Sequence, residues 1–344
     1  MGTAYFLSSL TSALLLSIFS HRIHFLNTQL KVFGYSKNRI FLKKPVFLKT
    51  PYPKIYADLL INSLQTSGGA MSEKIRTASV IMAAGRGSRM TPYEGNKTLL
   101  PLIPEKSFFE GKEPILVRIL RMLPPGPKAI IVNYKSQDVK NLTQHMGVVY
   151  CHQPELNGTG GAILAARQFL ADTDCEYVTI TMGDVPFIRP ESYRKLLETL
   201  KHHPMAVLGF IPGDKKRYGI LEISDDKVER ITEWKYWRSY PEAKQESLKI
   251  CNSGIYAIRR EELLRFLPIL ESRPQIVHKE RNGQMVAIQE YFLTDIVEYM
   301  NADGLSAGYV ITEDESETMG IDDLESLQKA QELYRQMADK ATDA

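Results

Sequence analysis

The chain has 344 residues, of which 44% are hydrophobic and 24% are charged, with a formal net charge of +3 at pH 7. This composition excludes a disordered chain and fits a globular protein of one large or two modest domains. Residues 1–70 hold eight Lys or Arg residues and one acid, Asp58, so the remainder carries 35 basic and 39 acidic residues. A mildly acidic body argues against a nucleic-acid partner, which needs a clustered basic face.

Residues 1–70 differ in character from the rest of the chain. Their apolar run, AYFLSSLTSALLLSIFS, is shorter than the roughly 20 residues of a bilayer span, and no positive charge precedes it. Three interpretations remain open: an over-long reading frame whose true start is Met71, a targeting segment, or a short membrane tether. Residues 71–344 are predicted to form the functional domain, without stable membrane association, and the sequence is silent on its oligomeric state.

The chain has three cysteines, Cys151, Cys175 and Cys251, without metal-type or redox spacing. An odd number of isolated cysteines does not form a disulfide framework. The sequence therefore predicts reduced thiols and a cytoplasmic protein.

From Met71 onward, apolar runs of strand length alternate with segments of helical period. The predicted strands cover residues 77–84, 128–134, 147–151, 176–182 and 205–211, and the predicted helices cover 114–123, 159–170 and 190–200. This alternation indicates an α/β fold: a Rossmann-like, mostly parallel mixed sheet flanked by helices. Residues 213–290 mix short strands with loops and are expected to form a smaller lid or acceptor-side subregion. A last helix is predicted over residues 320–337.

The turn after the first strand, within IMAAGRGSRMTPYEGNKTLLPL, raises the question of an anion site. Met90 stands where a dinucleotide fingerprint needs its third glycine, and Asn96 precedes Lys97 where a Walker loop needs glycine. The remaining interpretation is a tight turn that binds an anion. The guanidinium groups of Arg86 and Arg89 and the ammonium of Lys97 suit a triphosphate. The alternative is a surface turn with solvated cations.

Several segments in a fixed order carry a resemblance to a known family. MAAGRGSRM and NKTLLPL are followed by QPELNGTGGA, TMGDVPFI, RYGILEI, ITEWKYW, ICNSGIYAI, EYFLTDI and TMGIDDL. This succession, from residue 77 to about 330, resembles the nucleotide-sugar pyrophosphorylases, above all the uridylyltransferase domain of N-acetylglucosamine-1-phosphate uridylyltransferase. The resemblance implies a nucleotide-diphospho-sugar transferase fold and a Mg²⁺-dependent nucleotidyltransferase in residues 71–344. It implies transfer from UTP to N-acetylglucosamine 1-phosphate with release of pyrophosphate, a step of nucleotide-sugar biosynthesis.

The resemblance also assigns the nucleotide site. It gives Arg89, Lys97 and Arg86 catalytic roles at the phosphates. An amide such as that of Gln153 can pair with a pyrimidine edge, and Gly158 lets backbone pack against a base. A helix cap followed by close-packed glycines is the alternative interpretation of this second segment. The complete nucleotide-binding set is Ala83, Ala84, Gly85, Gly87, Ser88, Gln153, Gly158, Thr159 and Gly183.

A metal site is expected at the end of the strand in EYVTITMGDVPFI, because Asp184 falls at the carboxyl edge of the sheet. A carboxylate beside a polyphosphate adds repulsion unless a divalent cation lies between them, so Mg²⁺ is predicted. The resemblance implies Asp184 and Asp322 as ligands. An Asp at the start of a helix is often only its N-cap, and Asp323 is a rival for the second position.

The sugar site is predicted in the second half of the chain. In ITEWKYW, strand alternation would put Glu233 and Lys235 on one face and Trp234 on the other. The carboxylate would bind a sugar hydroxyl and the ammonium would offset phosphate charge, whereas the alternative is a surface ion pair of small energy. Three further sugar-binding candidates are Gly219, Asn252 and Thr294. For the last two, the alternatives are an ordinary turn signal and a helix cap.

The sequence departs from the family pattern at a few places. Asn96 replaces the proline usual before the family lysine, and Met182 stands where a tyrosine is common. No hexapeptide repeats follow the last helix, so acetyltransferase activity is not expected. Two alternatives remain: a nucleotidyltransferase for another sugar 1-phosphate or phosphocholine, and an inactive sugar-nucleotide-binding regulator. Retention of Arg89, Lys97 and Asp184 argues against the second, because these groups serve the transition state.

Overall fold

A computed structural model describes residues 35–36, 39–40, 76–281 and 284–343 of the chain. The chain divides into two compact units, Met1–Ser72 and Glu73–Ala344. In the first unit, β1 (Tyr35–Ser36) pairs with β2 (Arg39–Ile40) in antiparallel fashion. Most of residues 1–70 lies outside the described residues, so the interpretations of this segment stay predictions. In the described residues, no helix combines the length and apolar character needed to cross a bilayer.

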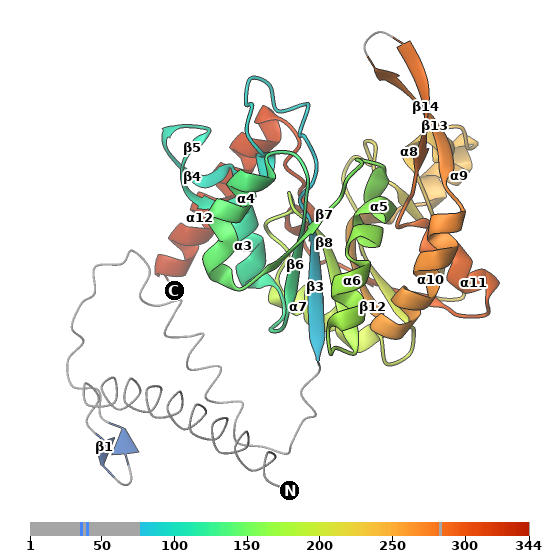
Figure 1. The fold of residues 1–344 in the computed structure, drawn as a ribbon, viewed down its shortest axis with the longest axis horizontal. Coiled ribbons are helices and arrows are strands. Elements are labelled where there is room, and N and C mark those ends of the chain that lie inside the picture. Colours follow the sequence, from blue (N-terminus) through green and yellow to red (C-terminus); the bar gives the residue numbers. More distant parts are fainter. Residues whose placement is uncertain (1–34, 37–38, 41–75, 282–283, 344) are drawn as a thin grey trace, which may run out of the picture. The chain divides into compact units, whose positions relative to one another are not determined.

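A mixed sheet of nine strands forms the centre of the second unit, within its described residues (Figure 1). The strands are short and mostly buried, as expected for a sheet with helices on both faces. In chain order they are β3 (Thr77–Met82), β6 (Lys128–Val132), β7 (Val149–His152), β8 (Tyr177–Met182), β9 (Met205–Phe210), β10 (Ile220–Ser224), β11 (Lys227–Thr232), β12 (Cys251–Arg259) and β15 (Ala307–Ile311).

The strand order is β10-β11-β15-β9-β12-β8-β3-β6-β7, and only β11 and β12 run against the other strands of this sheet. The predicted mixed α/β sheet is therefore confirmed. Met82 at the end of β3 lies opposite Met182 of β8 and Ile131 of β6. The loops that follow these three parallel strands consequently meet at one edge of the sheet, where α/β folds bind their ligands.

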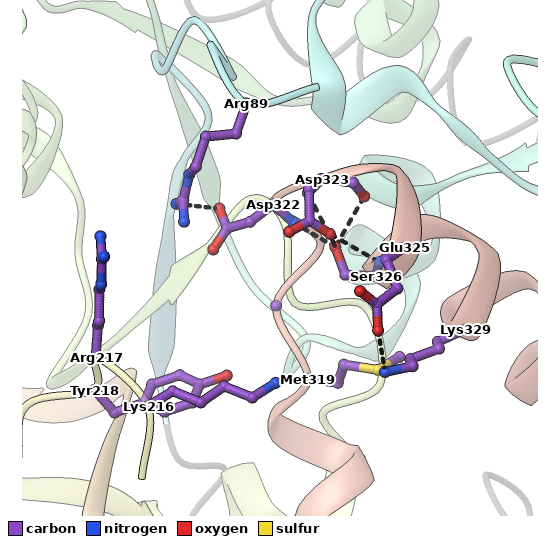
Figure 2. Close-up of a pocket in the computed structure, with 11 residues that line it drawn as sticks. Arg89, Lys216, Arg217, Tyr218, Met319, Asp322, Asp323, Glu325, Ser326 and Lys329 are labelled. Atoms are coloured by element: carbon purple, nitrogen blue, oxygen red, sulfur yellow. Dashed lines mark hydrogen bonds and ion pairs between the residues drawn. The ribbon is translucent and has the colours of Figure 1, made fainter. Parts of the chain in front are cut away.

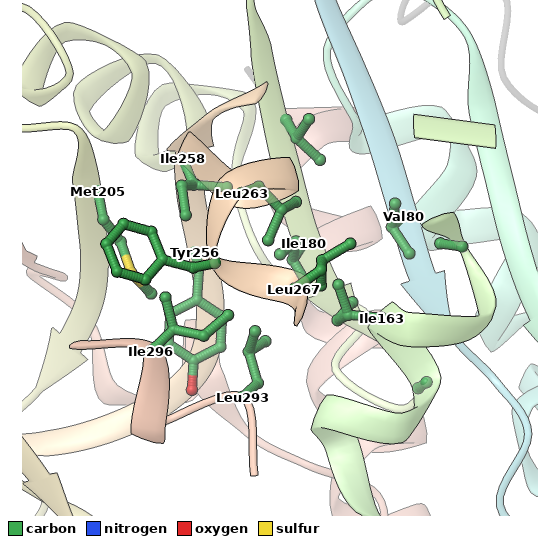
Figure 3. Packing of buried hydrophobic residues seen from close by; sticks show 14 of the residues in the cluster. Val80, Ile163, Ile180, Met205, Tyr256, Ile258, Leu263, Leu267, Leu293 and Ile296 are labelled. Carbon is green, nitrogen blue, oxygen red and sulfur yellow. The ribbon is translucent and has the colours of Figure 1, made fainter. Parts of the chain in front are cut away.

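Helices cover both faces of the sheet, and each face has its own apolar cluster. Because β3 is buried on both sides, Val80 packs into one cluster and Ile81 into the other. Figure 3 shows the first cluster, in which Val80 lies near Ile163 of a covering helix. One face carries α5 (Gly158–Ala165), α6 (Arg167–Asp172), α10 (Arg260–Ser272) and α11 (Asp295–Ala302), and the other carries α3 (Ile115–Met122), α4 (Ser136–Thr143), α7 (Pro190–Thr199) and α12 (Leu324–Asp343).

Smaller elements complete the unit. The hairpins are β4 (Pro101–Ser107) with β5 (Glu110–Pro114), and β13 (Gln275–Arg281) with β14 (Gln284–Glu290), which projects from the body in Figure 1. Short helices are η1 (Lys97–Leu99), η2 (Gln144–Met146), α8 (Trp234–Trp237), α9 (Glu242–Ser247) and η3 (Glu315–Thr318). Residues 213–290, for which a smaller lid or acceptor-side subregion is expected, include the β13–β14 hairpin, but their strand β12 lies inside the main sheet between β9 and β8.

Two local expectations are wrong. The strand predicted through ITEWKYW ends at Thr232, and Glu233 is instead the N-cap of α8. The helical turn buries Trp237, whose indole nitrogen donates to the carbonyl oxygen of Tyr218 at 2.8 Å. This tertiary contact overrides the strand pattern, so alternation does not decide where Glu233 and Lys235 point. The helix predicted over residues 159–170 is two helices that meet at Ala166.

Removal of residues 1–70 should leave the second unit intact, because, among the described residues, the two apolar clusters are made of residues 78–330. Protein that begins at Met71 is expected to unfold cooperatively at the same temperature as the full chain, measured by circular dichroism. It should also have the same specific activity in the assay given below. A lower midpoint or a loss of activity would show that the domain needs residues 1–70.

Candidate functional site

A cavity of about 520 Å³ opens at the carboxyl ends of β3 and β8. Its walls come from segments far apart in the sequence, and the turn after β3 supplies most of one wall. Thirteen of the residues predicted for the site line it: Ala83, Ala84, Gly85, Gly87, Ser88, Arg89, Lys97, Gln153, Gly158, Thr159, Asp184, Glu233 and Asp322.

The turn after β3 lies directly over Lys97. Gly87 has a φ of +62°, in the left-handed region that favours glycine, and its carbonyl accepts from the amide of Met90 at 2.9 Å. A Cβ at Gly87 would lie 3.1 Å from the Lys97 side chain. Met90 is buried and anchors the end of the turn, whereas the Arg89 side chain is 68% exposed. The turn therefore combines a fixed backbone with a guanidinium that can reach a ligand.

Three charged segments meet at Lys97. Its Nζ donates to Asp184 Oδ2 at 2.5 Å and to Asp322 Oδ1 at 2.8 Å, and Arg89 Nη2 lies 3.0 Å from the same Asp322 oxygen. The Lys97 and Asp184 side chains are only 12% and 11% exposed. Burial lowers the pKa of Lys97, but the two carboxylates raise it by more, so its net pKa lies above the ordinary value. Lys97 is thus a fixed cation at neutral pH.

The two aspartates before α12 have different roles. The Asp323 carboxylate accepts from the Ser326 amide at 2.9 Å and from the Ser326 hydroxyl at 2.7 Å, which is an N-cap arrangement. These bonds hold the pKa of Asp323 below its usual range. Asp322 instead points to Lys97 and Arg89, and Figure 2 shows it beside Arg89. The geometry therefore favours Asp322 over Asp323 as the partner of Asp184.

The carboxylates of Asp184 and Asp322 converge on one cation, the Lys97 ammonium. In the part of the chain that the structure describes, no cluster of three or more His, Cys, Asp or Glu residues could enclose a metal. Mg²⁺ is commonly held by one or two carboxylates, with substrate phosphates and waters completing its shell. The pair therefore fits a Mg²⁺ that arrives with a phosphate ligand.

The opposite end of the cavity is uncharged and closely packed. Gln153 is 3% exposed, and its Nε2 donates to the Gly158 carbonyl at 3.2 Å. Gly158 has a φ of +95°, and a Cβ there would lie 2.4 Å from the carbonyl oxygen of Tyr291. Thr159 Oγ1 accepts from the Leu293 amide at 3.1 Å. No side chain caps α5, so the capping alternative for this segment is not observed.

Glu233 forms another part of the cavity wall. Thr294 occupies the N-cap position of α11, as its alternative role predicted, but its side chain makes no cap bond there. Its Oγ1 instead donates to Glu233 Oε1 at 3.3 Å. A Cβ at Gly219 would lie 3.6 Å from Glu233 Oε2, and the Gly219 carbonyl accepts from the Asn252 amide at 2.8 Å. Burial raises the pKa of Glu233 above its usual value, although the Thr294 bond and Lys235 oppose this.

Six predicted residues lie behind or beside the cavity wall. Arg86 packs with its guanidinium 6.0 Å from the Tyr134 ring, and Lys235 lines an adjoining cavity of about 360 Å³ next to Glu233. Asn252 belongs to β12, and its Nδ2 donates to the hydroxyl of Tyr256 in the same strand at 2.8 Å. The six that do not line the 520 Å³ cavity are Arg86, Gly183, Gly219, Lys235, Asn252 and Thr294.

Comparison with known proteins places this geometry in a family. The model of the MobA-like NTP transferase domain matches residues 79–262, more than half of the chain. The chain belongs to this NTP transferase family. The matched range includes the turn after β3, Lys97, Asp184 and Glu233, whereas Asp322 lies beyond it.

Curated relatives agree with this membership. The chain is 30% identical over 267 residues to the bifunctional protein GlmU of Ruegeria pomeroyi, covering 76% of this chain and 53% of the relative. It is 32% identical over 264 residues to GlmU of Cereibacter sphaeroides, covering 75% and 52%. The chain thus spans about half the length of these curated relatives. The predicted resemblance to nucleotide-sugar pyrophosphorylases, and to the uridylyltransferase part of this protein, is confirmed.

A crystal structure assigned as a glucose-1-phosphate thymidylyltransferase from Bacillus anthracis superposes with a TM-score of 0.53. The match covers 75% of this chain and 95% of that chain at 21% sequence identity. At this identity the likeness supports the fold of the NTP transferase domain.

Sequence reasoning treated Asn96 only as a departure, but the structure gives it a positioning role in the NTP transferase domain. Asn96 is fully buried and is the N-cap of η1, which carries Lys97. Its Nδ2 donates to the carbonyls of Ala83 and Tyr134 at 3.2 and 3.0 Å, and its Oδ1 accepts from the amide and hydroxyl of Thr98 at 3.0 and 2.8 Å. The preference of Asn for N-cap positions was the available signal.

Two other wall residues were also missed. Glu290, which is 5% exposed, and Phe292 line both the 520 Å³ and the 360 Å³ cavities. Glu290 ends β14 and Phe292 follows two residues later. Both belong to EYFLTDI, one of the segments that carry the family resemblance, which was the available signal. They add an acidic and an aromatic group to the cavity beside Glu233.

We expect Asn96→Ala to destabilise the domain by about 1–3 kcal/mol, because buried groups lose their hydrogen-bond partners. It should also lower kcat more than it raises KM for the nucleotide, since Lys97 loses its support. Urea unfolding and steady-state kinetics measure the two effects. Asn96 has a φ of −79°, which proline can adopt, so Asn96→Pro should recover part of kcat. Equal kinetics for wild type and Asn96→Ala would contradict the positioning role.

Glu233→Gln should stabilise the domain at neutral pH. Folding raises the pKa of the Glu233 carboxyl. Such a group contributes its full stabilisation below the pKa of the unfolded state, and this contribution is lost as the pH rises through the pKa of the folded state. The variant should therefore have a larger free energy of unfolding than wild type at about pH 7.5, and the difference should shrink toward about pH 4.5. Urea unfolding at both pH values measures it. The exposed Glu246→Gln is the control and should show no such trend.

Proposed function

We propose that the NTP transferase domain moves a uridylyl group from UTP to N-acetylglucosamine 1-phosphate and releases pyrophosphate in a Mg²⁺-dependent reaction. The observation that carries this proposal is the convergence of Lys97, Asp184, Asp322 and Arg89 at one part of a cavity that also has an uncharged wall of Gln153, Gly158 and Thr159. A charged end suits phosphates, and a closely packed amide and glycine end suits a base. The relatives named GlmU support the same reading.

The chain's own residues would act mainly by alignment and charge. A phosphate oxygen of the sugar 1-phosphate attacks the α-phosphorus in line, and the bond from that phosphorus to the β-phosphate bridging oxygen breaks. The electron pair of this bond leaves with pyrophosphate. Because the attacking oxygen is already anionic, no general base is required, and the domain must instead hold two anions together.

Each charged group has a distinct place in this scheme. Lys97 lies at the centre of the charged cluster and would bridge the α-phosphate and the sugar phosphate. Arg89 projects from the turn after β3 and would bind the departing pyrophosphate, with Arg86 assisting from the same turn. Bound Mg²⁺, held by Asp184 and Asp322, would supply the positive charge that lets carboxylates and phosphates share this site.

Recognition of base and sugar would come from the two walls. Gln153, Gly158 and Thr159 would hold uracil against the segment that contains Tyr291. Glu233, held by Thr294, would accept a hydrogen bond from a sugar hydroxyl. Burial of a carboxylate costs stability, and such a cost is typical of a group retained for binding. The three buried free thiols support a cytoplasmic location for this reaction.

The test of this function is pyrophosphate release by purified protein with Mg²⁺. UTP, CTP, GTP, ATP and dTTP are each combined with a panel of sugar 1-phosphates and with phosphocholine. We expect release with UTP and N-acetylglucosamine 1-phosphate. Another productive pair would keep the reaction and change the substrates. Nucleotide binding without release from any pair would favour a non-catalytic regulator.

Variants of the charged cluster should separate its roles. Lys97→Ala and Asp184→Asn should each lower kcat by at least about 10²-fold, because each removes charge stabilisation from the reacting phosphates. Asp322→Asn and Asp323→Asn form a matched pair of neighbouring carboxylates. The first should lower kcat, and the second should leave kcat and stability nearly unchanged, because Asn caps a helix about as well as Asp. Kinetics and thermal unfolding distinguish them, and equal effects on kcat would argue against Asp322 as a site residue.

A further inference from the structure

The 360 Å³ cavity adjoins the 520 Å³ cavity and has no part in the reaction proposed above. Glu233, Glu290 and Phe292 line both cavities, so these three residues form the wall that the two share. Lys97 and Asp184 line the 520 Å³ cavity and not the 360 Å³ cavity. A ligand that extends from the charged cluster into the 360 Å³ cavity must therefore pass the shared wall.

The β13–β14 hairpin supplies one wall of the 360 Å³ cavity. Gln275 pairs with Glu290 across the hairpin, and Val277 follows two positions later, so Val277 and Glu290 share one face. The Gln275 side chain accepts from the Tyr236 hydroxyl at 3.1 Å and donates to Asp295 Oδ2 at 2.8 Å. These bonds tie the base of the hairpin to α8 and α11, and Figure 1 shows α8 beside the hairpin.

The start of α8 supplies another wall. The ring centre of Trp234 lies 4.9 Å from the guanidinium of Arg217 and 4.8 Å from that of Arg238. The Lys235 ammonium lies 5.0 Å from the ring centre of Phe292. Cation–π contacts of this kind hold side chains in place. Because Phe292 belongs to the shared wall, the ammonium of Lys235 is held beside that wall.

The charges of this cavity disfavour a charged ligand. The carboxyl groups of Glu233 and Glu290 would repel an anion, and the ammonium of Lys235 would repel a cation. His278, which is exposed, is the remaining polar residue of the lining. A neutral group with hydroxyls suits this set, because carboxylates accept from hydroxyls and an ammonium donates to them.

The same cavity also has apolar surface, from Trp234, Val277 and Phe292. Small-molecule sites combine such surface with a few polar groups that fix the orientation of the ligand. A sugar ring has an apolar C–H surface and hydroxyls at its edge, so it matches this combination. The volume of about 360 Å³ also falls within the range of such sites, which is about 300–1,000 Å³.

We propose that the 360 Å³ cavity binds a second, uncharged sugar ring, so that the domain accepts a disaccharide 1-phosphate. This inference rests on the proposed function and extends its acceptor beyond a monosaccharide. The reacting sugar lies between the charged cluster and the shared wall, and the second ring lies past Glu233 and Phe292. The chemistry is unchanged: the phosphate oxygen attacks the α-phosphorus, pyrophosphate leaves, and the bond between the two sugars stays intact.

Kinetics of the full chain with two acceptors test the cavity. N-acetylglucosamine 1-phosphate and N,N′-diacetylchitobiose 1-phosphate are each combined with UTP and Mg²⁺. We expect wild type to have at least as high a kcat/KM for the disaccharide as for the monosaccharide. Val277→Trp fills the cavity and should lower kcat/KM for the disaccharide at least about tenfold, or 1.4 kcal/mol, and leave that for the monosaccharide within about twofold.

The control variant is Ile276→Trp at the neighbouring position of β13. Successive side chains of a strand point to opposite faces, and Ile276 is 58% exposed and does not line the cavity. It should leave the kinetics of both acceptors unchanged. An equal loss for both acceptors in Val277→Trp, or an equal loss of disaccharide use in the control, would overturn the inference.

Calorimetry of wild type gives a measure that needs neither a variant nor turnover. The full chain with Mg²⁺ and α,β-methylene-UTP, whose α,β bridge is not cleaved, is titrated with each acceptor. We expect a lower Kd for the disaccharide, because its second ring adds contacts in the 360 Å³ cavity. Weaker binding of the disaccharide than of the monosaccharide would overturn the inference.

The two proposals can fail separately. If the monosaccharide 1-phosphate reacts and the disaccharide neither reacts nor binds, the second sugar site fails and the proposed function stands. If no acceptor reacts but wild type binds the disaccharide more tightly than the monosaccharide, the proposed reaction fails and the second sugar site stands.

Discussion

The contact of the buried Lys97 ammonium with the buried carboxylate of Asp184 and the partly exposed carboxylate of Asp322 is the interaction on which the site depends. It joins the turn after β3, the end of β8 and the start of α12. Burying such charges costs several kcal/mol per ion, so the arrangement persists only where each charge is compensated. Gly87 lies over the lysine, and Asn96 fixes the short helix that carries it. The parallel register of β3 with β8 brings these supports together.

The charged groups of this cluster are paired with one another, and these ion pairs would change partners when phosphates bind. Asp322 lies between Lys97 and Arg89, and a cation that accompanies a nucleotide would compete with both. Glu233 is also a charged group held at a cost, because its burial disfavours the carboxylate form. In the proposed function, this carboxylate would accept a hydrogen bond from a sugar hydroxyl. Groups held at a cost to stability commonly mark sites of function.

Two cavities, of about 520 and 620 Å³, meet at the ion pair of Arg89 and Asp322, which line both of them. Of these two, only the 520 Å³ cavity is lined by Gln153, Gly158 and Glu233. In the reaction that we propose, in-line displacement needs the attacking and leaving groups on opposite sides of the reacting phosphorus. The charged groups at the shared wall would therefore meet the phosphates rather than the base.

The sequence by itself determined most of the elements and the residue types that meet at the candidate site. Apolar runs predicted β3, β8 and α7 because buried strands and amphipathic helices have clear local periods. The glycine turn, Lys97 and Asp184 were identifiable because they follow strands whose ends must share an edge. Only tertiary structure decided the rest. Burial of Trp237 and its hydrogen bond to Tyr218 favour a helical turn where the local pattern predicts a strand. Pairing with β9 and β8 places β12 inside the sheet. Packing alone distinguished Asp322 from the capping Asp323 and showed Asn96 to be a support, because these contacts join segments that no local pattern connects.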